Sequence, residues 1–127
     1  MEKTSFNPDG VAAPVGGYAH GCLVAEGRRI LFVSGQIPAA PDGSIPADFE
    51  SQARNVWRNI ETVLKQAGMG FDNLVKVTAF LTDRAHIVPN RKIRNEMLGD
   101  RRIAMSAIIA GTLDPAWLLE VEAIAMD

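Results

Sequence analysis

The chain has 127 residues, of which 47% are apolar and 22% are charged. This length suits one hydrophobic core, so we predict a single domain over residues 1–127. The formal net charge is −2, and the basic residues form no block that could neutralise a phosphate backbone, which argues against nucleic acid as a partner. No apolar run approaches the ~20 residues that cross a bilayer, so no membrane partner is expected. The single cysteine, Cys22, excludes an internal disulfide, and without a signal segment we expect a cytoplasmic protein.

The first twenty residues predict a loop-rich entry, because prolines and glycines surround one short strand near Thr4 to Asn7. Two apolar runs follow, at residues 22–25 and 30–34, and Gly27 lies between them. This pattern predicts a β-hairpin with Gly27 in the turn. Prolines and a glycine between residues 39 and 46 indicate a connecting loop.

The clearest periodicity in the sequence lies between Phe49 and Ala67. Apolar residues recur there at spacings of three and four, which predicts a helix with one face on a core. Asp48 is placed to cap the first turn of this helix. Gly68 is placed to stop it in a left-handed conformation.

A strand and a second helix are predicted next. Residues 74–81, LVKVTAFL, are rich in the β-branched and aromatic side chains that strands prefer. A proline suits the first turn of a helix and Gly99 marks a stop, so a helix is expected over residues 89–98. Ile93 and Met97 would form its buried side.

Two apolar strands are predicted at the end of the chain, over residues 103–110 and 117–126. Ser106 is the only polar side chain of the first run, and so apolar a strand is expected to be covered on both faces. In the second strand Glu120 and Glu122 share one face, because side chains alternate along a strand.

Together these elements predict an α+β fold, a mixed sheet with two helices packed on one face. The other face then has no helix, although the strand at 103–110 is apolar on both sides. An exposed apolar area of that size is unusual on a monomer. We therefore infer a homo-oligomer in which the bare faces pack together.

Glu120 is the strongest candidate for chemistry. An ionised carboxylate in an apolar strand costs several kcal/mol unless a partner or a wet cleft accommodates it. One interpretation is a structural ion pair with an arginine of the same or a neighbouring subunit. The other is a cleft carboxylate that holds and polarises a water molecule.

Other polar residues point to chemistry less strongly. His20 and His86 are the only histidines, and their spacing from carboxylates matches no zinc or iron pattern, so no metal site is expected. His20 is either a pocket residue beside Tyr18 or a hydrogen-bonded surface residue. Cys22 begins a predicted strand, which favours a buried and unreactive thiol.

Several segments along the chain carry a family resemblance. They are, in order, Ala13-Pro14, Gly17-Tyr18, Gly21, Val33-Ser34-Gly35-Gln36-Ile37-Pro38 and Leu119-Glu120-Val121-Glu122-Ala123-Ile124-Ala125. Taken together they resemble the RidA/YjgF family of reactive-intermediate (enamine/imine) deaminases, over nearly the whole chain. The resemblance implies a chorismate-mutase-like fold and a homotrimer with three clefts between subunits.

The resemblance also implies an activity. Members with the well-known activity hydrolyse 2-aminoacrylate and related enamines or imines to 2-keto acids and ammonia, without a metal or cofactor. They bind the substrate carboxylate through an arginine of the penultimate strand, which makes two parallel charge-assisted hydrogen bonds. Glu120 is implied as the catalytic residue that positions water. The implied substrate-binding positions are Tyr18, His20, Ser34, Gly35, Met105 and Ala107.

Met105 is the departure from the family pattern, because alignment back from the last strand places it at the arginine. A methionine supplies no positive charge, and loss of a desolvated arginine–carboxylate contact typically costs about 2 to 5 kcal/mol. Arg91, Arg101 and Arg102 are the candidates to compensate. Asn90 is the candidate for a family cleft asparagine.

We therefore expect a metal-free RidA-like hydrolase that releases ammonia and a carbonyl product, with an imine, keto acid or carboxylate as its ligand. Its substrate is expected to diverge, since the flexible Met105 leaves room for a larger or uncharged imine. The alternative is a non-catalytic small-ligand binder or a holdase-like protein. RNA cleavage or translation inhibition, ascribed to some relatives, is a weaker alternative because the charge is balanced.

Overall fold

The structure is a computed structural model that describes residues 1–127. The helices and strands are β1 (Glu2–Phe6), β2 (Gly21–Ala25), β3 (Ile30–Gln36), α1 (Phe49–Gln66), β4 (Leu74–Leu81), α2 (Ile87–Leu98), β5 (Ala104–Ile109) and β6 (Leu119–Met126). A short 3₁₀ turn precedes β4 and another precedes α2.

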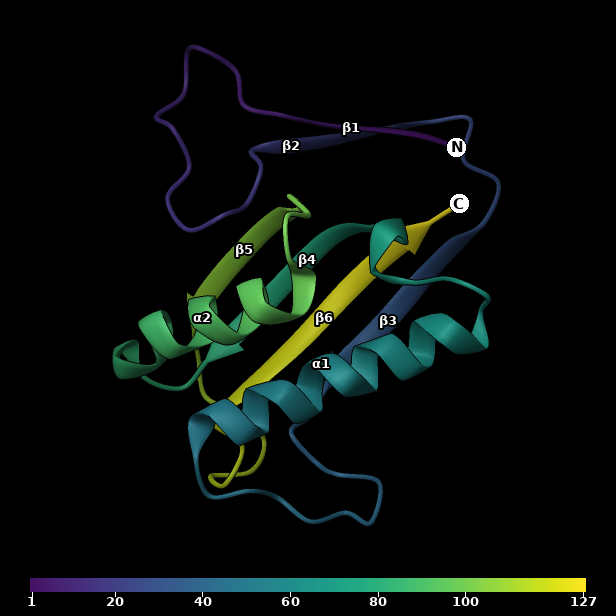
Figure 1. Cartoon of the computed structure of the whole chain (residues 1–127). Coiled ribbons are helices and arrows are strands. Elements are labelled where there is room, and N and C mark those ends of the chain that lie inside the picture. Colours follow the sequence, from purple (N-terminus) through teal and green to yellow (C-terminus); the bar gives the residue numbers. More distant parts are fainter.

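Four strands form a mixed sheet in the order β3-β6-β4-β5. β6 runs antiparallel to β3 and β4, whereas β5 runs parallel to β4. A parallel neighbour needs a crossover, and α2 supplies it between β4 and β5. α1 and α2 lie together on one face of the sheet (Figure 1), which confirms the predicted α+β architecture. We call the opposite face the bare face.

The predicted hairpin of residues 22–25 and 30–34 is wrong, although both strands exist. β2 pairs with β1 in a separate two-stranded sheet, which lies beyond one end of the four-stranded sheet (Figure 1). The backbone N–H groups of Arg28 and Arg29 donate to the carbonyl oxygen of Asp127, and the Arg29 side chain pairs with the Asp127 carboxylate. The segment between β2 and β3 is therefore bound to the end of β6. Strand propensity does not determine which strand β2 pairs with.

The helix α1 forms as its periodicity predicts. The Asp48 carboxylate accepts a hydrogen bond from the backbone N–H of Ser51 at 2.9 Å, and this bond lowers the pKa of the Asp48 carboxyl. Gly68 has a φ of 72°, the left-handed conformation expected after the helix. The predicted cap and stop are both confirmed.

The helix α2 begins at Ile87, slightly before its expected start, because a 3₁₀ turn over residues 84–86 leads directly into it. Ile93 is fully buried and Met97 packs against the core, as predicted. Gly99 follows the last turn with a φ of 58°. Neither helix combines the length and the hydropathy that a bilayer crossing requires.

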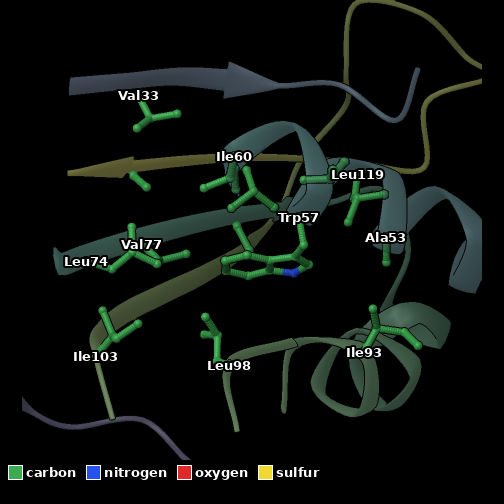
Figure 2. Close-up of a cluster of buried hydrophobic side chains, with 14 of the residues drawn as sticks. Val33, Ala53, Trp57, Ile60, Leu74, Val77, Ile93, Leu98, Ile103 and Leu119 are labelled. Atoms are coloured by element: carbon green, nitrogen blue, oxygen red, sulfur yellow. The ribbon is translucent and has the colours of Figure 1, made fainter. Parts of the chain in front are cut away.

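The core lies between the two helices and the sheet, with Trp57 of α1 near its centre (Figure 2). The indole ring meets Phe71 edge to face, with ring centroids 6.1 Å apart. Large buried rings of this kind contribute much of the apolar area that a small core removes from water. The fully buried residues around it include Ala53, Ile60, Leu74, Val77, Ile93 and Leu119.

The bare face keeps apolar side chains in contact with solvent. Phe32 of β3 has 73% of its surface exposed, and Ile30 and Ile108 are exposed too. In β5 residues 106–109 are all exposed, so the exposure includes both this face and the side toward α2. The expectation that β5 is covered on both faces is therefore not met within one chain. Covering it requires a contact with another molecule.

The core assignment can be tested with one substitution at two positions. Leu119→Ala removes a fully buried side chain of β6, whereas Leu113→Ala makes the same change where 95% of the surface is exposed. We expect L119A to lower the free energy of unfolding by about 2 to 5 kcal/mol, because it removes buried apolar area and leaves a cavity. L113A should change it by less than about 0.5 kcal/mol. Urea unfolding at a fixed protein concentration measures both, and equal effects would contradict the described core.

Candidate functional site

The most enclosed hollow of the chain lies between α2 and β5, beneath the loop that precedes β2. We call it the α2–β5 pocket. Its volume is about 330 Å³, within the range of small-molecule sites. Eight of its eleven lining residues are hydrophobic. The lining residues are Val15, Tyr18, Leu81, Ile87, Asn90, Arg91, Arg94, Met105, Ala107, Ile108 and Ile109.

The register between β4 and β5 explains why Met105 and Ala107 reach this pocket. Met105 pairs with Val77 and Ala107 pairs with Ala79. Val77 and Ala79 are buried beneath the helices, and paired residues of neighbouring strands point to the same face. Met105 and Ala107 therefore face α2.

The loop above the pocket approaches α2 closely through two glycines. Gly16 and Gly17 have φ values of 103° and 86°, which L side chains rarely adopt. A Cβ on Gly16 would lie 2.4 Å from Nε of Arg91. The carbonyl oxygen of Gly16 accepts a hydrogen bond from the guanidinium of Arg94. Tyr18, the residue that follows these glycines, lines the pocket.

All the charged side chains of the pocket come from α2. Asn90 and Arg91 lie four and three positions before Arg94, so each is a neighbour of Arg94 on the helix surface. Asn90, the candidate family asparagine, is buried and lines the same pocket as Met105. Arg94 keeps only 7% of its surface exposed.

Burial lowers the pKa of the Arg94 guanidinium, and the nearby charges of Arg91 and Arg102 lower it further. The Arg94 Nε has no hydrogen-bond partner. The ion pairs of the chain involve other residues, so neither Arg91 nor Arg94 is neutralised by a carboxylate. The pocket therefore carries uncompensated positive charge.

Of the three arginines considered from the sequence, only Arg91 lines the pocket. Arg101 pairs with Asp72 at 2.6 Å, and Arg102 donates to the carbonyl oxygens of Gly99 and Arg101. Arg94 was missed by sequence reasoning. The available signal was its place next to Ile93 on the buried side of α2, where a charged residue is unusual.

Glu120 lies on the bare face, away from the α2–β5 pocket. Its neighbours Leu119 and Val121 are fully buried beneath the helices, so the alternation turns Glu120 to the other side. A Cβ on Gly35 would lie 2.2 Å from Oε2 of Glu120, so the carboxylate rests against the Gly35 backbone. No arginine of the same chain pairs with Glu120. An ion pair with an arginine of a neighbouring subunit, the other form of that interpretation, stays a prediction.

Ser34 and His20 are the remaining predicted positions. Ser34 lies near Glu120, and His20 lies near the α2–β5 pocket. Ser34 is exposed on the bare face, in a hollow that also includes Lys76 and Glu122. His20 is half-buried beside Tyr18, with ring centroids 5.7 Å apart, but it does not line the pocket. Its Nε2 lies 2.6 Å from the carbonyl oxygen of Ala12. This is the hydrogen-bonded arrangement considered for His20.

The predicted site residues thus form two groups on opposite faces of the sheet. Tyr18, Met105 and Ala107 belong to the α2–β5 pocket, whereas Gly35 and Glu120 belong to the bare face. The sheet separates the two groups within one chain. No three side chains of the His, Cys, Asp and Glu types gather closely enough to hold a metal ion.

Comparison with known proteins places the chain in a family. The family model described as endoribonuclease L-PSP matches residues 10–127. A RutC family protein of Pyrococcus abyssi is 32% identical over 127 residues, covering 98% of each chain. TdcF of Escherichia coli K12, named as a candidate reactive intermediate deaminase, is 29% identical over 116 residues, covering 88% of each chain. The chain belongs to the L-PSP family, the RidA/YjgF family that its motifs resemble.

Solved structures share the fold. The Rid-family protein YyfB from Yersinia pestis matches with a TM-score of 0.87 over 100% of both chains, at 23% identity. E. coli TdcF, solved with bound serine, matches with a TM-score of 0.72 over 98% of both chains, at 26% identity. The predicted YjgF-like fold is confirmed.

The loop above the pocket can be tested through its glycines. Gly16→Ala forces an L side chain into a disfavoured φ and against Arg91, whereas Gly10→Ala adds a Cβ with no atom within 4 Å. We expect G16A to lower the free energy of unfolding by about 1 to 3 kcal/mol and to speed proteinase K cleavage of the loop. G10A should change neither quantity. A G16A protein that behaved like G10A would contradict the close packing of this loop.

Proposed function

We propose that the chain is a RidA-like hydrolase of reactive enamines or imines, with its active cleft formed between subunits of a homotrimer. The observation that carries this proposal is the division of the site residues between two faces of the sheet. Glu120 and Gly35 of one subunit would meet Tyr18, Met105 and Ala107 of another when the bare faces pack together. The homologue TdcF, named for reactive-intermediate deamination, supports this reaction class.

The bare face supports assembly from several copies. Phe32 and Ile108 expose apolar surface there, and burial of such surface drives association of subunits. Glu120 itself has no partner within its own chain, so an intersubunit cleft would give the carboxylate a polar environment.

The reaction follows from the chemistry of a C=N bond. An enamine first gains a proton at carbon and loses one from nitrogen, which gives the imine. Water held by the Glu120 carboxylate then adds to the imine carbon, and the carbinolamine collapses to the carbonyl product and ammonia. Backbone N–H groups near Gly35, or in the strand from Met105 to Ala107, polarise the imine.

The role of Glu120 can be tested with a matched neighbour. Glu120→Gln and Glu122→Gln remove the same charge from the same face of β6, but only Glu120 lies against Gly35. Imines are generated in situ from a panel of amino acids with an amino-acid oxidase, and release of keto acid is followed with and without the protein. We expect the wild-type protein to accelerate release, and E120Q to lose about 100-fold or more of this acceleration, because general base catalysis contributes about that much. E122Q should retain it.

The hydrolase proposal fails if no imine of the panel is hydrolysed faster at micromolar protein. The role of Glu120 fails if E120Q and E122Q have equal rates. Sedimentation velocity checks the assembly, and a monomer at micromolar concentration would contradict the intersubunit cleft.

A non-catalytic ligand binder is the second candidate. It is favoured by Met105, which supplies no charge at the family arginine position, and by the serine bound in the structure of TdcF. A ligand that raises the melting temperature without turnover would support this alternative. RNA cleavage, which the family description names, gains no support from the balanced charge of this chain.

A further inference from the structure

The α2–β5 pocket contains a buried cation with no counter-ion. Arg94 is almost fully buried, its Nε has no partner, and its only hydrogen bond goes to the neutral carbonyl of Gly16. A buried charge is costly unless it is paired, and an unpaired donor adds its own desolvation penalty. The chain itself leaves this cost uncompensated.

A second cation lies in the same pocket. Arg91 is only partly buried, lines the pocket and forms no ion pair. Its charge and that of Arg102 disfavour the charged form of Arg94. Clustered like charges of this kind repel one another, and an anion among them would relieve the repulsion.

We propose that Arg94 and Arg91 of α2 bind the carboxylate of an anionic ligand in the α2–β5 pocket, in place of the arginine that Met105 replaces. The proposal deepens the proposed function and rests on it for the reaction, because it makes the imine substrate an imino acid. Anion binding itself does not depend on turnover.

The shape of the pocket limits the rest of the ligand. Met105 and Ala107 line it together with Val15, Leu81 and Ile109, so most of its surface is apolar. Guanidinium groups suit a carboxylate through paired hydrogen bonds, and an apolar pocket of this size suits a hydrocarbon side chain. An amino-acid derivative with a branched aliphatic side chain meets both requirements, whereas a neutral amide leaves the cations unpaired.

Binding is measured by calorimetry on the full chain with two probes of equal shape, 4-methyl-2-oxopentanoate and 4-methyl-2-oxopentanamide. The variants are Arg94→Gln, Arg91→Gln and, as a charge-matched control, Arg58→Gln, which alters an exposed residue of α1. We expect the wild-type protein to prefer the carboxylate by about 30-fold or more, the effect of one desolvated ion pair. R94Q should abolish this preference, R91Q should reduce it, and R58Q should leave it unchanged.

The amide separates anion recognition from a structural role of Arg94. If the substitution collapses the pocket, neither probe binds. If it removes only the anion site, both probes bind and the preference for the carboxylate disappears. If R94Q fails to fold, R91Q decides, because Arg91 is partly exposed and makes no hydrogen bond that holds the loop. Equal affinity of the wild-type protein for both probes, or a carboxylate preference that both R91Q and R94Q keep, overturns the proposal.

Failure of the arginine site can be distinguished from failure of the hydrolase proposal. Imine hydrolysis without any carboxylate preference overturns the arginine site and leaves the hydrolase in place. Carboxylate binding that depends on Arg94, without hydrolysis of any imine, supports the arginine site and favours the non-catalytic binder.

Discussion

The side-chain alternation of the inner strands is the constraint on which the rest of the molecule depends. In β6, and in β4 from Val77 onward, every second side chain enters the core beneath α1 and α2. The pairing of Met105 with Val77 extends the same alternation to β5. A shift of one residue in any strand would exchange the two faces. The buried positions Leu119 and Val121 thus determine that Glu120 faces away from the helices.

This separation gives each face a different chemical character. The face beneath the helices ends in a pocket with two unpaired guanidinium groups, while the bare face presents a carboxylate among exposed apolar side chains. Neither half resembles a complete site by itself. A second copy of the chain is the simplest source of the missing half, since it would also cover the apolar surface that Phe32 and Ile108 expose.

The proposed carboxylate contact of Arg94 would come from a helix, whereas the arginine that the family resemblance implies would come from a strand. A strand arginine and a helix arginine approach a ligand from different directions, so they need not select the same substrates even when both bind a carboxylate. The glycines of the preceding loop belong to this arrangement. Without a Cβ at Gly16, the backbone comes close enough to hold one guanidinium and to pack against the other.

The sequence by itself determined the elements, the caps of α1, the burial of Ile93 and the family, because periodicity, capping residues and local motifs are properties of short segments. It also identified Tyr18, Met105 and Asn90, which the fold brings to one pocket. Only the tertiary structure decided that β2 pairs with β1, that the sheet separates Glu120 from Met105, and that Arg94 rather than Arg101 or Arg102 enters the pocket. These are choices of partner between distant segments, fixed by register and by the packing of α2 on β5, and no local pattern encodes them.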